Sequence, residues 1–207
     1  MMHIPTSLVT DIIRRVGKDD FRNLEPFIAA GPAYAELVFS EEVLRDADLD
    51  EFIFNGQLAN TESTYPPFLL RCLAENNPTA KYIESLHRLT QVGPSQEDLD
   101  MLGESALHSI DGHYAYSMLL ICCGALEDGL QLTTAFLDKV ENMEVAAMIA
   151  NQVERQIRDM GITGYRLFRG YYHFKEAPEC WFLHTTAIDV YEHCFAYTYA
   201  TRIHEMC

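Results

Sequence analysis

The helical spacing of apolar residues that recurs along the chain is clearest in the stretch Ile4-Pro5-Thr6-Ser7-Leu8-Val9-Thr10-Asp11-Ile12-Ile13-Arg14-Arg15-Val16-Gly17. Its aliphatic side chains recur every three or four residues, which places them on one face of a short helix. Pro5 and Ser7 are typical of a helix start, and Gly17 ends the pattern. Two more short apolar stripes follow, one at Leu24, Phe27 and Ile28 and the other at Tyr34, Leu37 and Val38. The sequence therefore predicts three short helices within residues 1–50.

Helical spacing continues downstream and predicts a mainly all-α fold. Residues 51–67 are expected to be a linker, because Asn55–Pro67 is polar and contains Gly and Pro. Further helices are expected at Phe68–Glu75, from Pro78, from Ser95 through Ile110, after a turn at Asp111-Gly112, after Gly124, at Glu144–Asp159 and at Thr185–Ile203. Residues 161–183 are compatible with either a strand pair or a loop.

A faint internal repeat organises the middle of the chain. Pro78-x-Ala80 and His113-x-Ala115 lie 35 residues apart, and each is expected to open a pair of helices. This period lies in the range of tetratricopeptide-like helical hairpins. We therefore expect a helical-repeat domain at residues 68–160, followed by an aromatic-rich C-terminal segment at residues 161–207 that ends in a helix.

Composition excludes several classes of partner. The 207 residues carry 15 Lys and Arg against 31 Asp and Glu, a formal net charge of −16. A chain without surplus cationic charge is not expected to bind nucleic acid or an anionic membrane surface.

The first residues lack the basic and apolar regions of a targeting segment, and no apolar run is long enough to span a membrane. Six cysteines without paired spacing indicate reduced thiols in a cytoplasmic or nuclear protein.

The chain shows no spacing typical of a catalytic site. It has no phosphate-binding loop, no Gly-x-Ser-x-Gly elbow and no His-Glu-x-x-His motif. Zinc-compatible spacings occur near the C-terminus, among Cys180, His184, His193, Cys194, His204 and Cys207. Packing in the core is the favoured interpretation of Cys194, because it shares a helical face with Tyr191. We therefore expect no enzymatic activity, no cofactor and no metal site.

The C-terminal segment is rich in aromatic residues, and residues 161–200 hold 11 of the 23 aromatic side chains. The favoured interpretation is that they close the core over the helices, since each aromatic side chain buries a large area. The alternative is a partner-binding face, because Tyr, Trp and Arg are enriched at interaction hot spots. The candidate target-binding residues are Arg166, Arg169, Tyr171, Tyr172 and Trp181.

The N-terminal pattern resembles a known motif. The run Ile4-Pro5-x-x-Leu8-Val9-x-x-Ile12-Ile13-x-x-Val16, with Leu24, Phe27, Tyr34 and Leu37 after it, is similar to an F-box. That motif opens with Leu/Ile-Pro, continues with paired aliphatic residues and adds apolar residues on two more short helices. The family usually has a basic or Cys-containing stretch before an aromatic residue, whereas here Ala29-Ala30-Gly31-Pro32-Ala33 precedes Tyr34.

The resemblance implies docking onto a Skp-type adaptor, which links the F-box to a cullin scaffold in a ubiquitin ligase. It assigns adaptor contacts to Ile4, Pro5, Leu8, Val9, Ile12 and Ile13. It assigns the same interface, or packing behind it, to Val16, Leu24, Phe27, Tyr34 and Leu37. The segments Asn77-Pro78-x-Ala80-x-Tyr82 and Gly112-His113-x-Ala115-Tyr116 are similar to a plant F-box group with Sel-type or tetratricopeptide-like repeats.

The expected function is therefore that of a substrate-recognition subunit of a Skp-cullin-F-box ubiquitin ligase. The F-box would bind the adaptor, and the repeats with the C-terminal segment would bind a target protein. One alternative is a helical-repeat scaffold with a degenerate F-box and no ligase role, which Gly31-Pro32 motivates. Another is a metal-dependent enzyme or zinc-stabilised module built from the C-terminal Cys and His residues.

Overall fold

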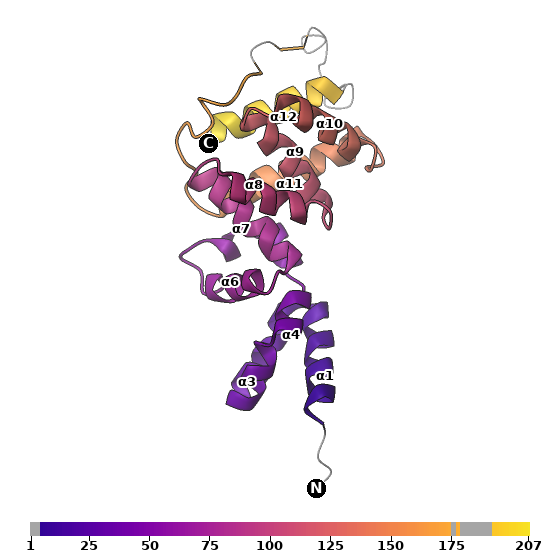
Figure 1. The fold of residues 1–207 in the computed structure, drawn as a ribbon, viewed down its shortest axis with the longest axis vertical. Coiled ribbons are helices and arrows are strands. Elements are labelled where there is room, and N and C mark those ends of the chain that lie inside the picture. The colour runs from indigo at the N-terminus through magenta and orange to yellow at the C-terminus, as the bar shows by residue number, and fades with distance from the viewer. Residues whose placement is uncertain (1–4, 175–176, 179–191) are drawn as a thin grey trace.

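The computed structural model describes residues 5–174, 177–178 and 192–207. All regular elements in this part of the chain are helices, which confirms the prediction of a mainly all-α fold. Figure 1 shows an elongated arrangement with the N-terminal helices at one end and the C-terminal helix α12 (Glu192–Met206) at the other. The two candidate partner-binding regions of the sequence therefore lie in different parts of the molecule.

The N-terminal helices form a small packed unit. Its elements are α1 (Thr6–Asp19), the 3-10 helix η1 (Phe21–Leu24), α2 (Glu25–Ala29), α3 (Pro32–Val38) and α4 (Glu41–Asp46). Ile13, Leu24, Val38 and Val43 form a core of their own inside this unit. The three expected helices are present, and α4 completes the core with Val43. Gly31, with a φ of 129°, separates α2 from α3, so the Gly31-Pro32 pair ends one helix and starts the next.

The expected linker at residues 51–67 is instead partly helical and partly core. It contains most of α5 (Asp50–Phe54) and the 3-10 helix η2 (Gly56–Ala59). Phe52 and Ile53 are buried in the main core. Their backbone oxygens accept hydrogen bonds from Gln156 at 3.2 Å and Gln152 at 3.0 Å. These bonds span about half of the chain, so local sequence gives no sign of them. Within residues 51–67, irregular structure is confined mainly to the residues between η2 and α6 (Pro66–Ala74).

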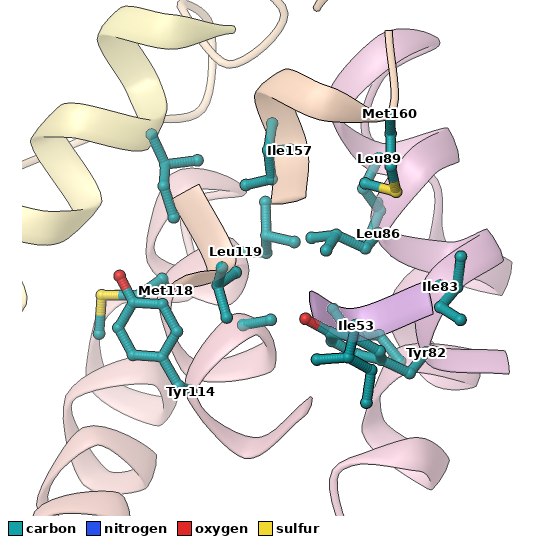
Figure 2. Close-up of a cluster of buried hydrophobic side chains, with 14 of the residues drawn as sticks. Ile53, Tyr82, Ile83, Leu86, Leu89, Tyr114, Met118, Leu119, Ile157 and Met160 are labelled. Atoms are coloured by element: carbon teal, nitrogen blue, oxygen red, sulfur yellow. The ribbon is translucent and has the colours of Figure 1, made fainter. Parts of the chain in front are cut away.

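Two successive helical pairs build the middle of the molecule. They are α7 (Pro78–Gln91) with α8 (Gln96–Ser105), and α9 (Ile110–Cys122) with α10 (Leu126–Leu137). The long helix α11 (Met143–Asp159) packs on α9, and α12 packs on α9 and α10. Figure 2 shows how Tyr82 and Leu86 of α7, Leu119 of α9 and Ile157 of α11 point toward one another in the main core.

The boundary between α8 and α9 differs from the prediction. Helix α8 ends at Ser105, and Ile110 begins a new helix instead of continuing α8. Asp111-Gly112 lies in the first turn of α9 because the Ser109 side chain caps that helix by accepting from the Gly112 N–H. His113 therefore lies inside α9 and does not open it, so the start of the second helical pair comes earlier than the repeat pattern predicts.

The segment that follows α11 forms turns up to residue 174, without a strand in the described residues. Hydrogen bonds join its backbone to α7 and to the C-terminal end of the chain. The Gly164 N–H donates to the Thr90 oxygen at 2.9 Å, and the Leu167 N–H donates to the Cys207 oxygen at 2.7 Å. Phe168 is fully buried in the main core. Figure 1 shows this segment passing beside the end of α12.

Phe21 and Leu44 of the N-terminal unit belong to the main core, and one buried polar side chain also joins this unit to the helical pairs. Asn77 is 1 % exposed, and its Oδ1 caps α7 by accepting from the Ala80 N–H at 3.0 Å. Its Nδ2 faces the backbone oxygens of Leu44, Arg45 and Ala47 at 3.0, 3.1 and 2.9 Å. Because these oxygens belong to the end of α4, a single amide fixes α4 against the start of α7.

Candidate partner-binding surfaces

Helix α1 carries an apolar face that the described structure leaves about half exposed. The Leu8 and Ile12 side chains are 52 % and 47 % exposed, and they lie one turn apart on the same side of α1. Thr10, Ile13 and Gly17 lie on the opposite side, which is buried. Two adjacent large aliphatic side chains left in solvent on a helix with a buried opposite face are typical of an interaction surface.

The structure divides the residues that the F-box resemblance assigned to adaptor contact. Pro5, Leu8, Ile12 and Tyr34 are exposed. Val9, Val16, Phe27 and Leu37 are half-buried, and all of them except Val16 pack against the small core. Ile13 and Leu24 are buried in the small core. Ile13 was expected at the adaptor contact, but it has no exposed surface and packs in the small core of the unit, so its adaptor contact stays a prediction. Ile4 lies outside the described residues.

Helix α2 carries a further exposed apolar residue. Ile28 of α2 is partly exposed, and the Gly31-Pro32 turn separates it from Tyr34 of α3. The sequence placed Ile28 in an apolar stripe but not among the candidate site residues. Figure 1 shows that α3 and the first half of α1 lie at the same end of the molecule. We refer to Leu8, Ile12, Ile28 and Tyr34 as the N-terminal face.

The residues predicted to bind a target fall into two groups. Arg166, Arg169 and Tyr171 are exposed. Tyr172 is instead packed on α12, where its hydroxyl lies 2.7 Å from the Thr201 hydroxyl and its ring stacks on His204 with centroids 4.4 Å apart. Burial raises the pKa of Tyr172 to about 12. Tyr172 therefore follows the core-closing interpretation, and Trp181 lies outside the described residues.

The cysteines of the described chain are packing residues. Cys72, Cys122, Cys194 and Cys207 are buried, and Cys123 is half-buried. Burial raises the pKa of the Cys72, Cys123 and Cys207 thiols to about 12, so these thiols are poor nucleophiles near neutral pH. Among the described residues, no three His, Cys, Asp or Glu side chains are grouped as metal ligands. Cys180 and His184 lie outside them.

A hollow of about 560 Å³ lies where the N-terminal unit meets α7 and α8. Lys18, Arg45 and Lys81 line it and are already neutralised. The Lys18 Nζ lies 3.0 Å from an Asp46 carboxylate oxygen, and the Lys81 Nζ lies 2.7 Å from a Glu104 carboxylate oxygen. Arg45 pairs with a glutamate one turn earlier on α4. The hollow therefore offers little uncompensated positive charge to an anionic ligand.

Comparisons with known proteins identify no relative of this chain: no family model, curated protein or solved structure matches it. In the described residues, no helix combines the length and the apolar character needed to cross a membrane.

Proposed function

We propose that the chain is a non-catalytic, substrate-recognition subunit of a Skp-cullin-F-box ubiquitin ligase. The N-terminal face would bind the Skp-type adaptor, and through it the cullin scaffold. The helical pairs and the C-terminal segment would bind a target protein. Such a receptor accelerates ubiquitin transfer by holding the target near the charged enzyme, which raises the effective concentration of the target.

The observation that carries the proposal is the exposure of Leu8 and Ile12 on a unit with its own core. Ile13 and Leu24 on the inner side hold the short helices together, so the outer side chains are not needed for packing. A small helical unit that keeps large aliphatic side chains in solvent is expected to be covered by a partner. The F-box resemblance supplies the identity of that partner.

The test is binding of the purified full chain to a plant Skp-type adaptor, measured by biolayer interferometry. The informative variant is Leu8→Asp with Ile12→Asp, because an interface there would bury two unpaired carboxylates. Removing the apolar contacts and burying those charges should weaken binding at least 100-fold. Circular dichroism of both proteins should be identical, since the two side chains are about half exposed in the free chain.

Leu70→Asp is the matched control. Leu70 lies on α6, is 47 % exposed like Ile12, and is outside the N-terminal face. Adaptor binding that survives Leu70→Asp but is lost in the double variant supports the proposal. Equal binding by the double variant and the unmodified chain contradicts it, and so does an adaptor that binds neither protein at micromolar concentration.

The Gly31 break favours a second candidate, a helical scaffold with a degenerate F-box and no ligase role. Helix α2 has only 5 residues, and Gly31 adopts a φ of 129° directly after it. A shortened second helix presents fewer side chains to an adaptor. Failure of the unmodified chain to bind the adaptor, together with a well-folded N-terminal unit, would favour this scaffold function.

A further inference from the structure

Three of the most exposed apolar side chains belong to two segments whose backbones touch. Ile162, Tyr165 and Val92 are 93 %, 80 % and 78 % exposed. Val92 follows the end of α7, and Ile162 and Tyr165 follow α11. The hydrogen bond from the Gly164 N–H to the Thr90 oxygen joins the two segments. We call Val92, Ile162, Tyr165 and Arg166 the loop face.

The backbone under the loop face is fixed at several points. The Thr163 hydroxyl donates to the Met206 oxygen at 2.8 Å, and the Leu167 N–H donates to the Cys207 oxygen. Gly161 packs so closely on Gln91 that an added Cβ would lie 2.9 Å from the Gln91 side-chain nitrogen. Exposed apolar side chains on an anchored backbone lose less entropy when they bind a partner than side chains on a free loop.

The loop face also carries unpaired positive charge. Arg166 adopts a φ of 58°, which is uncommon for a residue other than Gly, Asn or Asp. Its guanidinium lies 4.8 Å from the centroid of the Tyr165 ring. Within the described residues, neither Arg166 nor the exposed Arg169 makes an ion pair, whereas Arg14, Arg22, Arg45, Arg88, Arg158 and Arg202 each do. Arg15, Arg71 and Arg155 make no ion pair in the described residues either, so what distinguishes Arg166 is its position beside the exposed ring of Tyr165.

A hollow of about 260 Å³ adjoins Tyr165 and Arg166 and reaches the end of α12. His204 and Glu205 also line it, so the hollow contains one acidic side chain beside Arg166. An apolar side chain of a partner would fit between Tyr165 and α12, and a carboxylate of the same segment would pair with Arg166. Tyr and Arg together are the residue types most enriched at binding hot spots.

We propose that the loop face binds a partner segment in which an apolar side chain lies next to an Asp or Glu. Charge complementarity selects this class of partner: the chain as a whole would attract a basic segment, but the Arg166 guanidinium of the loop face makes no ion pair among the described residues. The proposal names the chemistry of the target and rests on the receptor function proposed above for its role in the cell. The binding itself is independent of the adaptor.

The first measurement is a selection from a random linear peptide library displayed on phage, against the immobilised full chain. The selected peptides are then synthesised, and their affinities are measured by fluorescence polarisation. We expect peptides that combine Asp or Glu with a neighbouring aromatic or aliphatic residue. Ile162→Ser with Tyr165→Ser should weaken their binding at least tenfold, and Arg166→Gln at least threefold with a smaller dependence on salt.

Leu107→Ser is the matched control. Leu107 is 84 % exposed and follows α8 at the end of the α7–α8 pair that holds the Lys81–Glu104 ion pair, away from Val92 at the end of α7. This variant should bind the peptides like the unmodified chain. Selected peptides that are basic or uncharged, no enrichment at all, or equal binding by the loop-face variants would overturn the proposal.

The same peptides separate this proposal from the receptor function. The Leu8→Asp/Ile12→Asp variant should bind the peptides with unchanged affinity, because the N-terminal face shares no residue with the loop face. Adaptor binding without peptide binding overturns the loop-face proposal alone. Peptide binding without adaptor binding supports the loop face and contradicts the ligase role.

Discussion

Replacing Asn77 with alanine should destabilise the protein by about 4 kcal/mol, more than most single substitutions. The buried side-chain amide makes hydrogen bonds to two different helices. Its oxygen caps α7, and its nitrogen satisfies the last carbonyl oxygens of α4. Alanine removes both functions and leaves the backbone oxygens of Leu44 and Ala47 without this donor in a buried environment.

The expected loss of stability follows from the number of N–H groups that the Asn77 amide can donate. Three oxygens lie within 3.1 Å of the Asn77 nitrogen, but an amide has only two N–H groups, so two hydrogen bonds are lost and not three. Each buried carbonyl left unsatisfied costs about 1–3 kcal/mol. Loss of the N-cap costs about 1 kcal/mol. Water that enters the adjoining hollow would offset part of the cost, so we take the lower half of that range for the two carbonyl oxygens.

Urea denaturation monitored by circular dichroism measures the free energy of unfolding, and an unchanged m-value indicates that the same amount of surface is exposed on unfolding. Asn77→Ser keeps a capping oxygen and should be about 1 kcal/mol more stable than Asn77→Ala. Asn77→Asp also keeps the cap but places a carboxylate against the α4 oxygens, so it should be at least as unstable as Asn77→Ala.

Asn142→Ala is the matched control. Asn142 is exposed and only caps α11, through the Val145 N–H, so its loss should cost about 1 kcal/mol. An Asn77→Asp variant as stable as the unmodified chain would refute the reasoning.

Three more predictions concern packing, hydrogen bonding and pH. Gly129→Ala should destabilise the fold by about 2 kcal/mol in the same assay, because a Cβ would lie 2.8 Å from a backbone oxygen of α9; Gly170→Ala, with nothing within 4 Å, should change stability by less than about 0.5 kcal/mol. Tyr172→Phe should cost about 1 kcal/mol, since it removes the hydroxyl contact with a threonine of α12, and a cost near zero would mean that water already satisfies that threonine. Burial raises the pKa of Glu154 above its ordinary value of 4.5, despite two arginines within 4 Å. The stability that this carboxyl contributes is therefore present below about pH 4.5 and is lost as the pH rises through its pKa in the folded protein. Between pH 4.5 and pH 7 the unmodified chain should accordingly lose stability relative to Glu154→Gln, and an opposite slope would contradict the sign.

Helix starts that depend on a local cap could be predicted from the sequence. Asn77-Pro78 and Ser95 both mark helix starts, because an Asn or Ser side chain satisfies an N–H group only two or three residues ahead. Ser109 has the same chemistry but was missed, since Asp111-Gly112 reads as a turn. The pattern was ambiguous there because glycine and aspartate are acceptable in the first turn of a helix as well as in a turn.

Features set by distant residues could not be predicted. Phe52 and Ile53 stand beside a polar stretch, and their burial and the bonds to Gln152 and Gln156 of α11 show that this part of the chain belongs to the core. The apolar stripe of α1 was predictable, but of the neighbours Ile12 and Ile13 the first is about half exposed and the second is fully buried. Which of them is buried depends on where Val38 and Val43 pack, and no local pattern contains that information.

The loop face illustrates a different difficulty. Val92 and Ile162 are isolated apolar residues in polar, glycine-containing stretches, and neither belongs to a helical stripe. Their proximity arises from a hydrogen bond between segments that are far apart in the chain. The sequence did single out Arg166 and Arg169, because Arg and Tyr near one another are typical of binding sites. The apolar half of the surface became visible only with exposure and contacts in hand.

The positions of the two faces suggest how a receptor of this shape would work. The N-terminal face lies on a unit with a small core, and Phe21 and Leu44 of the same unit belong to the main core, on which the loop face lies. Asn77 joins the two bodies through hydrogen bonds to backbone atoms of both. Backbone-to-backbone coupling through a buried side chain resists bending better than a flexible linker, because several bonds must break together. A target held at the loop face would therefore keep a fixed position relative to the adaptor. The binding free energies of the two partners should then be additive, since the two faces share no side chain.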